Sequence, residues 1–176
     1  MKITIGGQAG VGKGTISRLL AKQYGLELFS VGDVFRMMAK ERAMTVHEFH
    51  ELVEKDSSMN LSLEEKTKQI GKEHQKLVFE GRLAWYAIPD SVKILLTCSD
   101  DVRFKRVASR ENHSVEEAQK HTQAREALTT SWYKKLYGID SCVDPKHYDL
   151  VVDTTAIFPH EIIEVITKFI EDKKKV

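Results

Sequence analysis

The sequence predicts an α/β fold in which a five-stranded parallel sheet lies between helices on both of its faces. Three observations carry this prediction: short apolar runs typical of covered strands, helical periodicity between them, and a glycine-rich loop after the first run. Ligands of such sheets collect at the carboxyl ends of the strands. Functional residues are therefore expected directly after strands.

The predicted elements follow one another at short intervals. The five predicted strands are 2–5, 26–30, 77–79, 92–97 and 150–152. The clearest predicted helices are 15–24, 33 to about 42, one that begins near Ser99, and 159–173. On the first helix, the spacing of Ile16, Leu19 and Leu20 predicts one shared buried face.

Three further helix starts are predicted by one local signature, a hydroxyl residue followed three positions later by an acid. This spacing allows a capping box, in which each side chain binds the backbone N–H of the other residue. The three pairs are Thr45 with Glu48, Ser62 with Glu65, and Ser114 with Glu117.

One domain spanning residues 1–176 is expected from the length of 176 residues. A segment of about 33–75 reads as a small helical insertion, because its second part, 45–75, is polar and has too few apolar positions for a core of its own. The insertion is therefore expected to pack against the α/β core.

The charge balance excludes several classes of function. Lys plus Arg number 27 and Asp plus Glu number 26, so the net charge of +1 lacks the basic excess of a nucleic-acid-binding domain. No apolar stretch approaches the length of a membrane span, and the strand after Met1 leaves no room for a signal peptide. A cytoplasmic monomer is expected.

Metal-ligating patterns are weak in this chain. Cys98 and Cys142 lie far apart in the sequence and are expected to be free thiols in a reducing compartment. His47 and His50 are three residues apart, but no third ligand converges with them. A structural zinc site is therefore not predicted.

The strongest functional signal is a phosphate-binding loop between the first strand and the first helix. Glycines there allow consecutive N–H groups to point into one concavity, and the helix adds its positive end. The loop places the chain with three-layer folds of the P-loop NTPase type. Its residues are Gly7, Gln8, Ala9, Gly10, Val11, Gly12, Lys13, Gly14 and Thr15.

Two side chains of this loop suit nucleotide chemistry. Lys13 can reach the β- and γ-phosphates of ATP, and the hydroxyl of Thr15 can take a coordination site of Mg²⁺. The usual pattern has Ser or Thr directly after the lysine, whereas Gly14 intervenes here. This Gly-Lys-Gly-Thr string resembles the loop of the nucleoside monophosphate kinases, which include adenylate and cytidylate kinases.

A second string resembles the segment with which those kinases begin their acceptor-binding lobe. The residues Ser30, Gly32, Asp33 and Arg36 match a Ser-x-Gly-Asp-x-x-Arg pattern after the second strand. The resemblance implies that Arg36 grips the phosphate of the monophosphate, as the bidentate fork of an arginine can. Taken alone, an arginine early in a helix is usually solvated.

A third string, Glu80-Gly81-Arg82, ends the third strand and resembles Glu-Gly-Arg-Leu-Ala of the archaeal-type cytidylate kinases. An acid at this place can hold Mg²⁺ through its water, and Arg82 can make a second clamp on the acceptor phosphate. The bland alternative for Glu80 is a solvent-facing loop acid. Trp85 and Tyr86 are expected to pack rather than to stack on a base.

Arginines recur at i, i+3 and i+7 on the helix after the fourth strand, and they are expected to share one face. They are Arg103, Arg106 and Arg110. The resemblance implies a lid at about 110–130, with Arg106 and Arg110 against the donor nucleotide and Arg125 across the transferring phosphate. The alternative is an exposed basic face paired with acids, chiefly for Arg103.

One departure from the archaeal-type pattern concerns the string Tyr-Lys-x-x-Tyr-Gly-Ile-Asp at 133–140. An arginine often precedes it in those kinases, and residues 130–132 contain none. Lys134 or Lys135 would have to substitute, and a lysine offers no bidentate fork.

The resemblance covers nearly the whole chain and implies transfer of the γ-phosphoryl group of Mg-ATP to CMP or dCMP. The choice of cytidine rests on likeness alone. An adenylate kinase is the alternative within this class, and a regulatory P-loop ATPase is the alternative from another class. A regulatory ATPase would not need the acceptor clamp of Arg36 and Arg82. A GTPase is disfavoured because the sequence has no guanine-reading [NT]KxD string.

Overall fold

The computed structural model describes residues 1–176 except 46–47, 50–51, 54–55, 57, 174 and 176. Its strands form one parallel sheet in the order β2-β3-β1-β4-β5, which confirms the predicted α/β fold. The strands are β1 (Lys2–Gly6), β2 (Glu27–Ser30), β3 (Leu77–Glu80), β4 (Val92–Thr97) and β5 (Leu150–Asp153).

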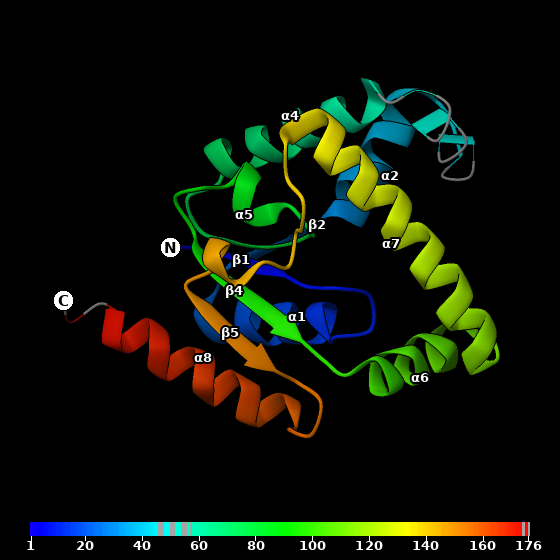
Figure 1. The fold of residues 1–176 in the computed structure, drawn as a ribbon. Coiled ribbons are helices and arrows are strands. Elements are labelled where there is room, and N and C mark those ends of the chain that lie inside the picture. Colours follow the sequence, from blue (N-terminus) through cyan, green and yellow to red (C-terminus); the bar gives the residue numbers. More distant parts are fainter. Residues whose placement is uncertain (46–47, 50–51, 54–55, 57, 174, 176) are drawn as a thin grey trace.

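Helices connect these strands, as Figure 1 shows. They are α1 (Lys13–Tyr24), α2 (Val31–Glu41), α4 (Ser58–Glu73), α5 (Ala84–Ala87), α6 (Asp100–Glu111), α7 (Val115–Tyr137), the 3₁₀ turn Pro145–His147, and α8 (Pro159–Lys173). No helix among the described residues is long and apolar enough to cross a bilayer.

The central strand β1 decides where the glycine-rich loop lies. Its residues Ile3 and Ile5 have no exposed surface, because β3 and β4 flank it and helices cover both faces. In the register of the sheet, Ile5 stands beside Glu80 on one side and Ile94 on the other. The loop that follows Gly6 therefore emerges at the carboxyl edge, next to the end of β3.

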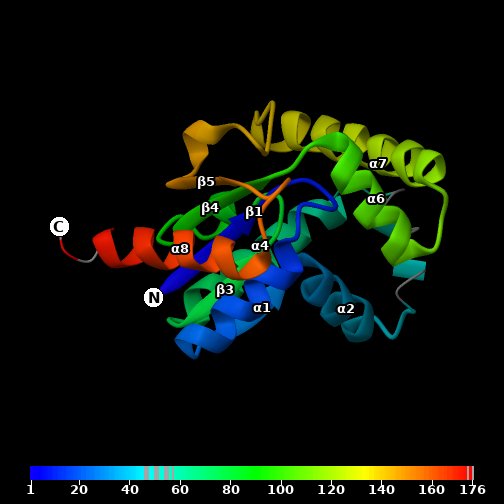
Figure 2. The ribbon, with the colours of Figure 1, turned by 90° about the horizontal axis from the view of Figure 1, so that it is seen from below.

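Helices cover both faces of the sheet (Figures 1 and 2), and two apolar clusters pack against it. Val78 packs in the cluster formed with α1 and α8, whereas Leu77 and Phe79 pack in the cluster formed with α2, α4 and α5. This alternation follows from the period of two along a strand. Phe49 and Val53 belong to the second cluster, so the polar segment before α4 packs its apolar side chains against the core of the sheet and not against a core of its own.

The helices α6 and α7 form a long hairpin at the carboxyl edge of the sheet (Figure 1). The hairpin has a small apolar contact with the loop, in which Ala9 packs with Val107, Ala108 and Ala118. At 23 residues, α7 is long enough to run from the loop back toward α4 and α5. Its end reaches α5, where the ring centroids of Tyr137 and Tyr86 are 5.4 Å apart.

The three predicted capping boxes have different outcomes. Ser114 and Glu117 form a full box at the start of α7, which confirms that prediction. Thr45 and Glu48 make the same reciprocal hydrogen bonds, although some residues that follow them lie outside the described ranges. The predicted start at Ser62 is wrong, because α4 already begins at Ser58.

Two other expectations need correction at the level of single residues. The helix after β2 begins at Val31 rather than Asp33, because Ser30 and Asp33 form a capping box that the sequence analysis did not identify. Leu19 was expected on the buried face of α1 but is 38% exposed, since the core-facing positions are Ile16, Ser17, Leu20 and Ala21.

The two serines provide a matched test of these helix starts. Ser114→Ala should lower the free energy of unfolding by about 1 kcal/mol, because the first turn of α7 loses its cap. Ser62→Ala should be neutral or stabilising by up to about 0.5 kcal/mol, because Ser62 is inside α4 and alanine favours helices. Urea unfolding measures both, and equal losses would contradict these helix boundaries.

Candidate functional site

The glycine-rich loop between β1 and α1 has the backbone that an anion-binding loop requires. Gly7, Gly10 and Gly12 have φ values of 138°, 84° and 95°, a region that side chains disfavour. A Cβ at Gly10 would lie 2.3 Å from the carbonyl oxygen of Arg103, so the loop also packs closely on α6. The fold thus presents this loop at the amino end of α1 without room for side chains.

Lys13 closes this loop from inside. Its Nζ atom donates hydrogen bonds to the carbonyl oxygens of Gly7 at 2.9 Å and Gln8 at 2.7 Å. Burial and, to a smaller extent, the positive charge of Arg82 lower the pKa of Lys13 to about 8, and the carboxylate of Glu80 opposes the shift. The site therefore concentrates positive charge where ammonium and guanidinium groups have little water to screen them.

Glu80 lies beside the loop at the end of β3. Its Oε2 atom is buried and has no hydrogen-bond partner among the described residues. A Cβ on Gly14 would lie 3.4 Å from this oxygen, so the unusual glycine brings the backbone against the carboxylate. Burial raises the pKa of Glu80, and the charges of Lys13 and Arg18 oppose that rise.

These oxygens fit a magnesium ion that is held mainly by its substrates. The orphaned Glu80 oxygen and the exposed hydroxyl of Thr15 flank the loop, and hard oxygen donors are the ligands that Mg²⁺ prefers. The described part of the chain contains no group of three or more His, Cys, Asp or Glu side chains that could together hold a metal ion. His47 and His50 lie outside the described residues.

Arg36 is positioned by the cap of α2. Its Nη2 atom donates to Asp33 Oδ1 at 2.6 Å, while Asp33 Oδ2 accepts from the backbone and hydroxyl of Ser30. Burial would raise the pKa of Asp33, but the hydrogen bonds from Ser30 and Arg36 outweigh it and lower that pKa. The guanidinium lies over Gly32 and is 62% exposed, so it remains accessible to a ligand.

The ends of β2 and β3 bring the two predicted acceptor segments together. Ser30 stands beside Glu80 in the register of the sheet. A Cβ on Gly81 would lie 2.5 Å from Val31 Cγ2, so the turn after β3 packs directly on the start of α2. Arg82 follows in this turn and is mostly buried.

Glu126 on α7 is the central residue that the sequence analysis missed. Its carboxylate accepts two hydrogen bonds from the Arg103 guanidinium at 3.2 Å each and one from the backbone N–H of Ala9 at 3.2 Å. The Gln8 amide also donates to it at 3.4 Å, and Arg82 Nη2 lies 3.7 Å away. No spacing in the sequence pairs residue 126 with these groups.

For Arg103, the alternative of an exposed basic face is wrong. Instead of lying on an exposed basic face, its side chain is 3% exposed and is held by Asp100 at 2.6 Å, by Glu126, and over the Phe104 ring. A guanidinium this deep is stable only when its donors are satisfied. Arg103 is therefore a strut between α6, α7 and the loop.

The other predicted arginines differ in their placement. Arg106 donates to the Thr154 carbonyl at 2.9 Å and lies 3.5 Å from the Gly10 carbonyl, so it touches the outer side of the loop. Thr154, another residue that the sequence analysis did not single out, is buried and donates its hydroxyl to Val11. Arg110 and Arg125 are exposed on the hairpin, and Arg110 pairs with Glu111.

The lysines considered as substitutes for the missing arginine lie at the end of α7. Lys134 pairs with Asp140 at 2.9 Å, and both side chains are exposed. Lys135 is exposed as well. Neither of them has a contact with the loop among the interactions of the described residues.

Comparison with known proteins identifies the family. The cytidylate kinase-like family matches residues 2–156 of this chain. The chain belongs to this family. A cytidylate kinase from Methanocella arvoryzae is 38% identical over 175 residues, which cover 99% of both chains. A cytidylate kinase from Archaeoglobus fulgidus is 33% identical over 176 residues, which cover 99% of this chain and 97% of that one.

Solved structures confirm the three-layer fold of the P-loop kinases for this family member. An uncharacterised protein from Eubacterium ventriosum superposes with a TM-score of 0.73 at 18% identity, covering 97% of this chain and 98% of its own. Shikimate kinase from Aquifex aeolicus gives a TM-score of 0.63 at 15% identity, covering 99% and 98%. At these identities the likeness concerns the fold alone.

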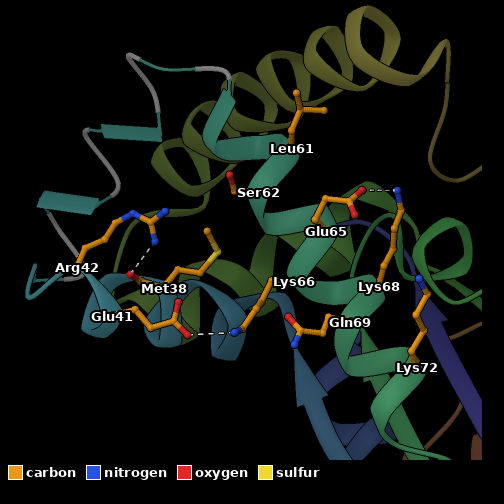
Figure 3. Close-up of a pocket in the computed structure, with 10 residues that line it drawn as sticks. All are labelled: Met38, Glu41, Arg42, Leu61, Ser62, Glu65, Lys66, Lys68, Gln69 and Lys72. Carbon is orange, nitrogen blue, oxygen red and sulfur yellow. Dashed lines mark hydrogen bonds and ion pairs between the residues drawn. The ribbon is translucent and has the colours of Figure 1, made fainter.

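A groove lies away from the loop, between α2 and α4 (Figure 3). It has a volume of about 540 Å³ and is lined by charged side chains such as Glu65, Lys66 and Lys72. None of its lining residues belongs to the loop, and none is Arg82, Arg103 or Arg106. The groove is therefore separate from the candidate site, which consists of the loop with Lys13, Arg82 and Glu126.

The carboxylate of Glu126 should be a large contributor to the stability of this family member. Glu126→Ala should lower the free energy of unfolding by about 3 kcal/mol, because it leaves the buried Arg103 guanidinium without its two-pronged partner. Glu116→Ala, at an exposed acid of the same helix, should change it by less than about 0.5 kcal/mol. Urea unfolding compares the two variants, and a similarly small effect of both would contradict the role of Glu126 as the partner of buried Arg103.

Proposed function

We propose that this chain transfers the γ-phosphoryl group of ATP to CMP or dCMP, producing ADP and the corresponding diphosphate. Relatives named cytidylate kinase that are 38% and 33% identical over nearly the full length support the proposal. The observation that carries it is the convergence on one carboxylate of a loop N–H and two guanidinium groups. Donors that hold a carboxylate in this way also suit phosphoryl oxygens.

The donor nucleotide would bind along the loop. Its N–H groups from 7 to 15 would hold the β-phosphate, with Lys13 leaving the carbonyls of Gly7 and Gln8 to reach the phosphates. Arg106 would approach the donor from the outer side of the loop. The family resemblance supports this assignment, and the segment after β5 would then face the donor base.

The acceptor would bind at the ends of β2 and β3. Arg36 and Arg82 would clamp its phosphate from two sides, while Ser30, Gly32 and Asp33 shape the start of α2. Gly81 keeps the turn after β3 close to this start. Two guanidinium forks can fix the orientation of a phosphate, which a pair of lysines could not do as well.

The chemistry requires positioning and charge stabilisation more than a proton acceptor. The attacking oxygen of the monophosphate is already ionised, so no general base is needed. Lys13, Arg82 and the lid arginines Arg110 and Arg125 would neutralise charge on the transferred group. Bound Mg²⁺ would supply further charge neutralisation between the phosphates, and Thr15 and Glu80 are the residues that would hold it.

The lid role assigned to about 110–130 implies motion. Arg110 and Arg125 are exposed in this structure, so they would have to approach the loop when both nucleotides are bound. Closure would also exclude water, which otherwise competes as an acceptor. The segment of about 33–75 would act as the acceptor lobe within a single domain.

The state of Lys13 predicts how nucleotide affinity depends on pH. Its pKa is about 8 in the free protein, because burial disfavours the ammonium form, and a bound triphosphate would raise that pKa. Binding above pH 8 must then take up a proton, so affinity should fall about tenfold between pH 7 and pH 9. Equilibrium titration with ATP measures this slope.

Matched lysine variants control that titration. Lys22→Met, at an exposed position of α1, should keep the slope of the wild type. Lys13→Met should bind ATP weakly and lose the slope. A slope that persists in Lys13→Met would assign the titrating group to another residue.

A coupled assay of ADP release with AMP, CMP, dCMP and UMP tests the function. We expect turnover that depends on CMP or dCMP, and none in Lys13→Ala. Arg82→Ala should raise the KM for the acceptor at least about tenfold while the KM for ATP changes less than about threefold, because the acceptor phosphate loses one fork. Arg42→Ala, at an exposed arginine beyond the end of α2, is the matched control.

The panel also identifies the competing functions. Preference for AMP would indicate an adenylate kinase. ATP binding without acceptor-dependent ADP release for any monophosphate would indicate a regulatory ATPase. Unchanged acceptor use in Arg82→Ala would contradict the role given to that arginine.

A further inference from the structure

The buried acid Glu64 lies on the inner face of α4, outside the groups used so far. Glu64 is only 8% exposed, and its Oε1 atom has no hydrogen-bond partner among the described residues. Burial raises the pKa of Glu64 to about 7, Lys68 opposes the rise and Glu65 adds to it. A carboxyl group buried without a partner costs stability, so packing alone does not account for it.

The inner face of α4 changes character along its length. Its later part is apolar, since Ile70 and Gly71 pack against Ile88. Its earlier part presents Glu64 and Thr67, which are polar and buried. Thr67 satisfies its hydroxyl by donating to the Leu63 carbonyl at 2.9 Å, and Glu64 has no equivalent. The first half of α4 therefore contains a buried polar group that has no hydrogen-bond partner among the described residues.

Aromatic side chains lie along this side of α4, since Lys68, one turn after Glu64, has its Nζ atom 5.5 Å from the centroid of the Tyr86 ring. Burial and then the negative charge of Glu64 raise the pKa of Tyr137 to about 12. The ring of Tyr137 is 5.4 Å from Tyr86 and 6.4 Å from Tyr133 between centroids. The acid thus stands at the edge of a cluster of rings that can pack on a flat base.

Tyr133 connects this cluster to the acceptor phosphate clamp. Burial raises its pKa, and the charges of both Arg82 and Glu64 act on it in opposite directions. Tyr133 follows Glu126 by seven residues on α7 and so shares its face, and Arg82 Nη2 lies 3.7 Å from Glu126 Oε1. The clamp arginine, the aromatic rings and the buried acid thus belong to neighbouring parts of the fold.

The order of these groups is that of a nucleoside monophosphate. With its phosphate on Arg82, the acceptor would direct its base past Tyr133 toward Glu64. A carboxylate oxygen accepts a hydrogen bond from the exocyclic amino group of cytosine. Uracil has a carbonyl oxygen at the same position. When Glu64 is ionised, above its pKa of about 7, this oxygen would face the carboxylate with two acceptors and no proton between them.

We propose that Glu64 is a specificity-determining residue that binds the exocyclic amino group of the acceptor base and thereby separates CMP from UMP. The proposal rests on the proposed function and names what selects its substrate. It gives the buried oxygen the partner that the protein itself does not provide. Adenine carries an amino group too, so the exclusion of purines is left to the size of the site.

The neighbouring acid supplies the matched control. Glu65 is one position along α4 and faces the outer groove, where its Oε1 atom accepts from Lys68 at 2.9 Å (Figure 3). Glu65 is exposed, and its charge raises the pKa of Tyr137 as that of Glu64 does, but its carboxylate is paired with Lys68 instead of being buried without a partner. Glu65→Gln therefore makes the same chemical change outside the proposed base site.

The experiment compares kcat/KM for CMP and UMP in wild type, Glu64→Gln, Glu64→Leu and Glu65→Gln. The amide of Glu64→Gln can rotate to donate to uracil, so the CMP/UMP ratio should fall about tenfold or more. Glu64→Leu should lose CMP use about tenfold through KM, with UMP use changed less than about threefold. Glu65→Gln should keep the ratio of the wild type. Thermal unfolding verifies that each variant is folded.

The CMP/UMP ratios of the variants decide whether Glu64 selects the acceptor base. A CMP/UMP ratio within about twofold of wild type in either folded Glu64 variant, or equal losses for the two acceptors, would overturn the proposal. If wild type phosphorylates neither pyrimidine monophosphate, the proposed function itself fails, which this design separates from a failure of Glu64 alone.

Discussion

The ion pair between Arg103 and Glu126 is the interaction on which the rest of the site depends. It joins the two helices of the hairpin and places a carboxylate against the Ala9 N–H of the phosphate-binding loop. Because Arg103 is almost completely buried, this contact exists only when α6, α7 and the loop are assembled together. The loop is thus held by tertiary contacts as well as by its glycines.

The same carboxylate explains how so much positive charge is tolerated near the loop. Lys13, Arg82 and Arg103 surround a small region, and Glu80 and Glu126 balance them. Each side chain is half-buried or deeper, so water screens these charges poorly. Glu80 and Glu126 therefore keep the net positive charge of this region low.

Local signals predicted the elements of this protein well where a few neighbouring residues decide the structure. The phosphate-binding loop and the box at Ser114 need only adjacent residues, and both are present. The same signature failed at Ser62, because helix formation had already begun at Ser58 and an internal serine has no free N–H groups to cap. The segments 30–36 and 80–82 lie side by side because the parallel strands that precede them end at the same edge of the sheet.

Short strings and apolar periodicity are enough to predict the parallel sheet, the loop and the resemblance to the family. The assembled fold is needed to show that Arg103 is a buried strut, that Glu126 contacts the loop, and that Glu64 Oε1 is buried without a partner among the described residues. The physical reason is distance along the chain. Residues 9, 103 and 126 interact through buried, charged hydrogen bonds, and such long-range contacts produce no periodic pattern in the sequence.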